Sequence, residues 1–132
     1  MKNTITWCDR TMFYFPHYYC CVTTPALFEQ ELKRLKIAER DWPPYLSKPE
    51  ANATVWELET PGGGKAFIIT LAGWQGKDGI EVAGLLVHEA THIKQEVIRS
   101  MGEKNCGDEF EAYMMQNIAQ NLMTCFLEQT KL

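Results

Sequence analysis

No CxxC pair occurs in this 132-residue chain, and its five cysteines are odd in number and irregularly spaced. That pattern argues against a disulfide framework or a thiolate zinc site, so we expect free, partly buried thiols. No apolar run approaches the roughly 20 residues that a membrane span requires. No basic segment followed by an apolar one marks an export signal. We therefore expect a soluble, cytoplasmic protein with no membrane partner.

Concentrated basic charge is also missing. Aspartate and glutamate outnumber lysine and arginine by 17 to 13, and the two signs are mixed along the chain, with a formal net charge of −4. Binding to a phosphate backbone calls for a basic face, so no nucleic-acid partner is expected. The length fits a single domain over residues 1–132, whose core can fold without a structural metal. A bound metal would then serve function.

The hydrophobic periodicity predicts an α+β domain. Thr24 and Pro25 are typical of a helix start, and apolar residues at helical spacing extend that helix to about residue 39. Alternating segments predict strands over 53–59 and 66–72, joined as a hairpin by a Pro-Gly-Gly-Gly turn. Two long helices follow, over about 80–101 and 108–128, with Gly102 capping the first. The predicted order is helix, hairpin, helix, helix.

Each long helix carries an apolar stripe that we expect to face the core. In the first helix the stripe comprises Val82, Leu85, Leu86, Ile93 and Val97. In the second it comprises Ala112, Met115, Ile118, Ala119 and Leu122.

Residues 88–92 read His-Glu-Ala-Thr-His, an HExxH motif on the first long helix. Positions i and i+4 lie one turn apart on one face, so the imidazoles of His88 and His92 can reach one zinc ion. Glu89 lies beside the pair, where its carboxylate can act as general base towards a zinc-bound water. Both histidines fall within the apolar stripe, where burying imidazoles without partners is costly and a metal would satisfy them. The motif predicts a zinc hydrolase.

A catalytic zinc usually has a third protein ligand. A metzincin would have Gly at 95 and His at 98, but this chain has Gln95 and Ile98, so that class is excluded. Glu109 and Glu111 open the second long helix, which a short connection over 102–107 allows to pack antiparallel to the first. Helical phase alone does not separate these two carboxylates.

With these residues the chain resembles the gluzincins, zinc metallopeptidases with HExxH on one helix and a ligand glutamate on a later one. In several branches, including the SprT-like and ImmA/IrrE-like proteins and the membrane-bound CAAX proteases, that glutamate begins an E-x-x-A pattern. Glu109 to Ala112 matches the pattern, and the small alanine would allow close approach to the first helix. The resemblance covers about residues 53–125 and implies a minimal zincin-like domain with Glu109 as third ligand and Glu111 as the alternative. Overall the chain looks like the compact, single-domain metallopeptidases encoded by phages and prophages.

The resemblance also implies roles around the metal. Many gluzincins place Asp or Asn after the small residue of that pattern, where it supports a ligand histidine. This chain has Tyr113, whose hydroxyl would either hydrogen-bond His88 or pack between the helices. The strand before the active-site helix commonly borders the cleft, so residues 67–72 are expected to bind an extended peptide through their backbone.

The expected function is a zinc-dependent peptidase acting on a peptide or protein substrate. The alternative is a zinc-bearing regulatory or protein-binding module with little or no proteolytic activity. Small size favours the module, whereas the intact Glu89 favours the enzyme. A zinc nucleobase deaminase would need H-x-E with a downstream P-C-x-x-C, and neither is present.

Overall fold

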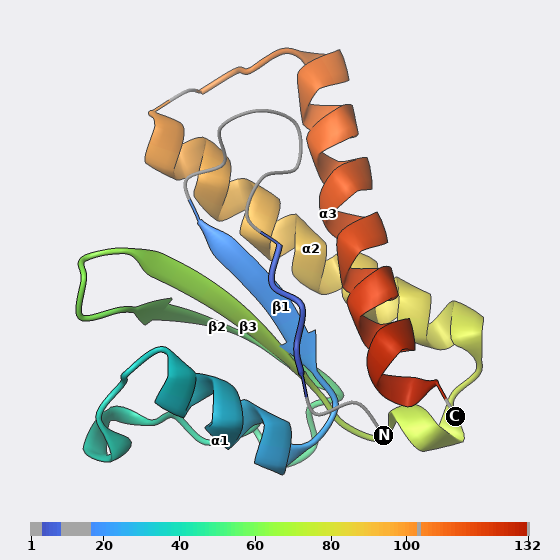
Figure 1. The fold of residues 1–132 in the computed structure, drawn as a ribbon. Coiled ribbons are helices and arrows are strands. Elements are labelled where there is room, and N and C mark those ends of the chain that lie inside the picture. Colours follow the sequence, from blue (N-terminus) through green and yellow to red (C-terminus); the bar gives the residue numbers. More distant parts are fainter. Residues whose placement is uncertain (1–3, 9–16, 103, 132) are drawn as a thin grey trace.

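The computed structural model describes residues 4–8, 17–102 and 104–131, and in them it confirms the mixed α+β class (Figure 1). The elements, in chain order, are β1 (Tyr18–Val22), α1 (Pro25–Arg34), β2 (Ala53–Glu59), β3 (Lys65–Leu71), α2 (Gly79–Met101) and α3 (Asp108–Thr130). Short 3-10 turns lie at Glu39–Asp41 and Trp74–Gly76. The predicted hairpin and both long helices are confirmed, whereas β1 was not predicted.

The three strands form one sheet in the order β1-β3-β2. β3 pairs in parallel with β1 and antiparallel with β2, so Ile68 lies between Cys20 and Trp56. The prediction that residues 67–72 form the strand edge of a peptide cleft is therefore wrong, because both sides of β3 are already paired. Among the described strands, β2 is the one with a free edge beside α2.

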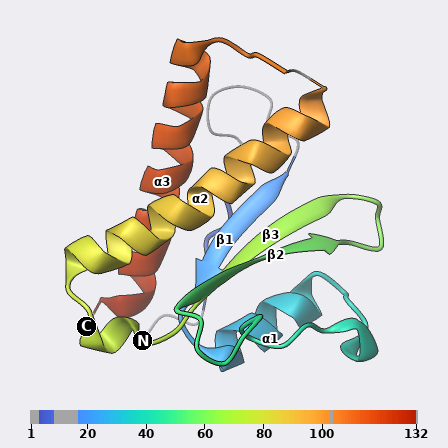
Figure 2. The same ribbon diagram turned by 180° about the vertical axis from the view of Figure 1, so that it is seen from behind.

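Helices cover both faces of this sheet. α1 lies on one face, and α2 and α3 lie on the other, as the two opposite views show (Figures 1 and 2). On the α3 side, the Tyr19 hydroxyl accepts a hydrogen bond from Asn121 at 2.8 Å, and the Cys21 thiol donates to the Leu122 carbonyl. The strand β1 is thus held by the Asn121 side chain and the Leu122 backbone carbonyl of α3.

The buried stripe of α2 differs from the predicted one at the positions that matter for function. Val82, Leu86, Ala90, Ile93 and Val97 are buried, but Leu85 is partly exposed. The prediction that the two motif histidines lie within the core stripe is wrong: both imidazoles face solvent, and Glu89 takes the buried position.

A similar shift occurs in α3. Met114, Ile118, Ala119, Leu122 and Cys125 are the buried residues of this helix. Met115 is only partly buried, and Ala112 is exposed, so it does not provide the close helix approach that was predicted for it.

The helix ends follow from local capping. Asp78 and Glu81 form a capping box at the start of α2, and Gly102 ends that helix with a left-handed φ of 74°, as predicted. α1 ends at Arg34, earlier than predicted, because Lys36 adopts a positive φ of 61° and the Ile37 amide bonds back to the Leu32 carbonyl. Although α2 and α3 are each 23 residues long, no helix in the described segments is apolar enough over a sufficient length to cross a bilayer.

Gln129, near the end of α3, ties this helix to the end of β1. Its Oε1 accepts a hydrogen bond from the Thr23 amide at 3.0 Å, and its Nε2 donates to the Cys21 carbonyl at 2.7 Å. We expect Gln129→Ala to lower the free energy of unfolding by about 1–3 kcal/mol, because the buried Thr23 amide loses its side-chain partner and the Cys21 carbonyl keeps only the weaker Cys125 thiol as a side-chain donor. Gln120→Ala, on the exposed side of the same helix, should change it by less than about 0.5 kcal/mol. Urea unfolding followed by circular dichroism measures both, and equal effects would contradict the assignment.

Candidate functional site

The HExxH motif lies near the middle of α2, on the side of the helix that borders β2. His88 and His92 extend their rings side by side, with centroids 5.0 Å apart and planes at 77°. The His88 side chain is 69% exposed, and Nδ1 of His92 lies 3.3 Å from the Gln95 side-chain oxygen. The two imidazoles therefore share one solvent-facing surface, as the i and i+4 spacing predicts.

Glu89 lies beneath the histidine pair. The residue is only 6% exposed, and its carboxylate is 4.0 Å from Nε2 of His88. Burial raises the pKa of this carboxyl above its ordinary value, while the neighbouring His88 and His92 act in the opposite direction. A carboxyl with a raised pKa is better able to take up and release a proton near neutral pH than an exposed glutamate.

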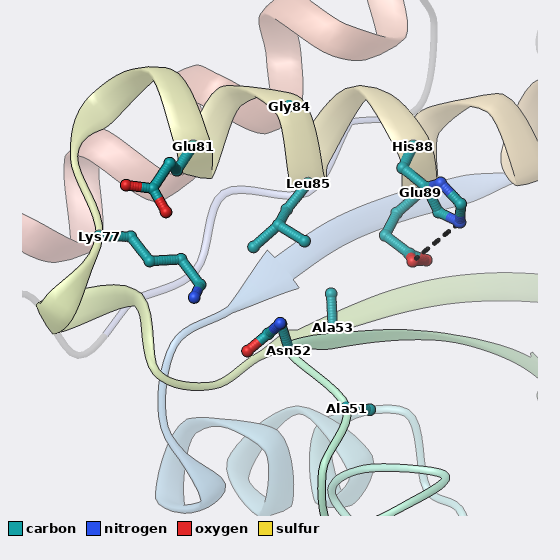
Figure 3. A pocket seen from close by; sticks show the side chains of 9 residues that line it. All are labelled: Ala51, Asn52, Ala53, Lys77, Glu81, Gly84, Leu85, His88 and Glu89. Atoms are coloured by element: carbon teal, nitrogen blue, oxygen red, sulfur yellow. Dashed lines mark ion pairs between the residues drawn. The ribbon is translucent and has the colours of Figure 1, made fainter.

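Two depressions lie along this side of α2, one on each side of the histidine pair. The larger, of about 570 Å³, is lined by Ala51, Asn52, Ala53, Lys77, Glu81, Gly84, Leu85, His88 and Glu89 (Figure 3). The smaller, of about 330 Å³, is lined by Val55, Glu57, Phe67, His92, Gln95, Glu96 and Arg99. The motif thus occupies the centre of a row of recesses between α2 and β2.

The backbone of β2 faces the same recesses. The Asn52 carbonyl accepts from the Ala72 amide, and the Thr60 amide donates to the Gly64 carbonyl. Because hydrogen-bonded positions alternate along an antiparallel pair, even-numbered residues of β2 bond to β3. The N–H and C=O groups of Ala53 and Val55 therefore point away from β3, next to the depressions that these residues line.

The structure does not bring the α3 carboxylates to the histidine pair. Glu109 is exposed, and Glu111 lies 3.8 Å from the Lys94 ammonium, on the side of α2 that contacts α3. Within the described segments, no three side chains of His, Cys, Asp or Glu are grouped so that they could hold a metal ion. The assignment of Glu109, with Glu111 as the alternative, stays a prediction.

Tyr113 is 53% exposed on α3, and its expected hydrogen bond to His88 likewise stays a prediction.

The site fits zinc in part. Two exposed imidazoles one helical turn apart supply nitrogen ligands that zinc binds at about 2.0–2.1 Å, and a carboxylate suited to act as base lies beside them. Among the described residues, a third His, Cys, Asp or Glu is not in place beside them.

Sequence reasoning did not find the residues that shape the larger depression. Asn52 and Lys77 come from loops that carry no motif. Gly84 does carry a signal, because glycine in the interior of a helix is about 1 kcal/mol less favourable than alanine and needs a reason.

No protein-family model matches this chain, and no curated protein or solved structure is significantly similar to it. The functional interpretation therefore depends on the geometry of the site itself.

The buried Glu89 predicts a pH-dependent effect on stability. Because its pKa is raised in the folded state, the folded protein loses stability as pH rises from below the unfolded pKa through the folded pKa. With a chelator present, we expect Glu89→Gln to unfold at a higher urea concentration than the wild type near neutral pH. The difference should shrink below a pH of about 4, where the carboxyl is protonated in both states.

Glu29→Gln, at an exposed position of α1, provides the control and should shift the urea midpoint little at either pH. A stabilisation by Glu89→Gln that grows on acidification would contradict the proposed cost of burying the carboxylate.

Proposed function

We propose that this chain is a zinc-dependent peptidase that hydrolyses peptide bonds, with His88 and His92 as metal ligands and Glu89 as general base. One observation carries the proposal: two solvent-facing imidazoles lie one helical turn apart over a buried carboxyl whose pKa is raised. A helix that only packed against the sheet would gain nothing from burying a glutamate there.

Each residue then has a definite task. Zinc, when bound, supplies a Lewis acid and lowers the pKa of a coordinated water to about 7. His88 and His92 would hold the ion at the solvent-facing side of α2. Glu89 would accept the proton of the attacking water and deliver it to the departing amine, and its raised pKa suits it to this exchange.

The third ligand is proposed to come from the first turn of α3. The Glu109 side chain has no ion pair or hydrogen bond among the described residues, so no such interaction has to break for it to bind zinc. Glu111 is the alternative, and it would have to leave Lys94.

The free edge of β2 supports a peptide substrate. An extended chain laid beside β2 would pair with the outward backbone groups of Ala53 and Val55 and pass the histidine pair. This edge takes the role that was expected of residues 67–72.

A second candidate is a regulatory or protein-binding module that holds a peptide along β2 without cleaving it. The separation of Glu109 and Glu111 from the histidines favours this candidate, because peptide binding needs no complete metal site. Localisation in the cytoplasm and a phage-type origin stay predictions from the sequence.

Zinc content tests the site. We expect close to one zinc per chain by elemental analysis of protein purified without chelator, and loss of that zinc in His88→Ala and Glu109→Ala. Glu111→Ala should retain the metal, and Asp108→Ala, which removes a neighbouring exposed carboxylate, serves as control. Loss with Glu111→Ala alone would reassign the third ligand. A wild type that binds no added zinc would overturn the proposal.

Hydrolysis separates the two candidate functions. We expect Glu89→Gln to keep its zinc but to cleave a quenched fluorescent peptide library at least about 100-fold more slowly, since the general base is lost. Equal rates in both proteins would rule out Glu89 as the base. A wild type that binds zinc and peptides but cleaves none would favour the binding module.

A further inference from the structure

Gly84 occupies an unusual position in α2. It lies inside the helix, one turn before His88, and it lines the larger depression (Figure 3). A Cβ added at Gly84 would meet no atom within 4 Å, and the residue does not adopt a positive φ. Neither the backbone conformation nor a close neighbour therefore requires glycine here.

Glycine is less favourable than alanine in a helix interior, because it gives up more conformational freedom on folding. The nearest explanation lies in the space that its missing side chain leaves. That space belongs to a recess of about 570 Å³, within the range of roughly 300–1,000 Å³ that is typical of small-ligand pockets.

Next to the motif the walls of this recess are small and apolar, and the Asn52 amide lies beside them (Figure 3). Ala53 and the partly exposed Leu85 lie between the Glu89 end and the opposite end, where Lys77 and Glu81 are found (Figure 3). Lys77 and Glu81 carry opposite charges, so the far end has no net charge that would select an acidic or a basic group. A partly exposed leucine on a recess wall is stabilised when an apolar group covers it.

We propose that this recess binds a large apolar or aromatic side chain of the substrate residue next to the cleaved bond, and that Gly84 sets the size of the side chain accepted. The inference rests on the proposed peptidase function, because that function defines which substrate residue lies next to the cleaved bond. His88 and Glu89 form one end of the recess, so a side chain in it is adjacent to the reacting groups.

Matched substrates test the inference. Each pair of quenched fluorescent peptides has Phe or Ala at one position beside the cleaved bond and is otherwise identical. One pair varies the residue before the bond and a second pair varies the residue after it, and kcat/KM is measured for all four peptides. In the wild type we expect Phe to be preferred by about tenfold or more on one side. Gly84→Leu should lower the Phe/Ala ratio of kcat/KM by about tenfold, because it slows cleavage of the Phe peptide. The kcat/KM for the Ala peptide should change by less than about threefold.

Gly79→Leu is the matched control. It adds the same side chain to the same helix at an exposed glycine that also has open space, but outside the recess, and should leave the Phe/Ala ratio unchanged. Gly84→Ala is the smaller step and should give an intermediate ratio together with a higher urea midpoint. It keeps the test decisive if the leucine variant does not fold.

A second readout does not require hydrolysis. N-acetyl-phenylalaninamide is titrated into the wild type and the variants, and binding is followed by NMR shifts of the amides of residues 84 and 85. We expect Gly84→Leu to weaken binding of this amide by about tenfold and Gly84→Ala to weaken it less. Gly79→Leu should bind the amide as tightly as the wild type does.

The two proposals then fail in different ways. Cleavage with the same Phe/Ala ratio in the wild type and both Gly84 variants would overturn the subsite and leave the peptidase intact. No cleavage of any peptide, with binding of the phenylalanine amide that depends on Gly84, would overturn the peptidase and retain the apolar site. Binding that is indifferent to Gly84 would overturn the subsite in either case.

Discussion

Burial of the apolar stripe of α2 is the constraint on which the candidate site depends. Val82, Leu86, Ile93 and Val97 are almost fully buried, and they fix the rotation of the helix about its axis. Successive residues of an α-helix are about 100° apart, so a rotation by one position would bury an imidazole or expose Glu89. The core residues thus determine which motif side chains meet water and which carboxyl has a raised pKa, although none of them has a chemical role.

Two features of α2 oppose stability, and both border the same recess. Glu89 is a buried carboxyl, and Gly84 is a glycine in a helix interior with open space beside it. The capping box of Asp78 and the left-handed cap at Gly102 stabilise the two ends of the helix and offset part of this cost. Unfavourable residues that persist in one recess are typical of sites where function, and not stability, determines the residue type.

The sequence could predict those parts of the structure that depend on neighbouring residues. The hairpin, the start and end of α2 and the spacing of the motif follow from alternation, caps and helical period, and all are present. β1 could not be predicted in the same way, because its five residues are ordered by β3, more than 40 positions later. The central place of β3 depends on that same pairing. The exposure of His88 also could not be predicted, since an apolar stripe does not show how far the core face extends around a helix.

The third metal ligand is hardest to predict for a related reason: helical phase gives a direction, whereas coordination requires a distance between two helices. The packing of Met114, Ile118 and Leu122 sets the phase of α3 and leaves Glu111 beside Lys94. That ion pair is a weak restraint, because its atoms are 3.8 Å apart and the Glu111 side chain is 45% exposed. Pairs near the surface contribute about 0–1 kcal/mol, whereas a structural zinc ion contributes about 10–16 kcal/mol in small peptides. A metal held by His88 and His92 could therefore displace Lys94 from Glu111 at little cost. The present contacts of the first turn of α3 therefore give Glu109 only a small advantage over Glu111.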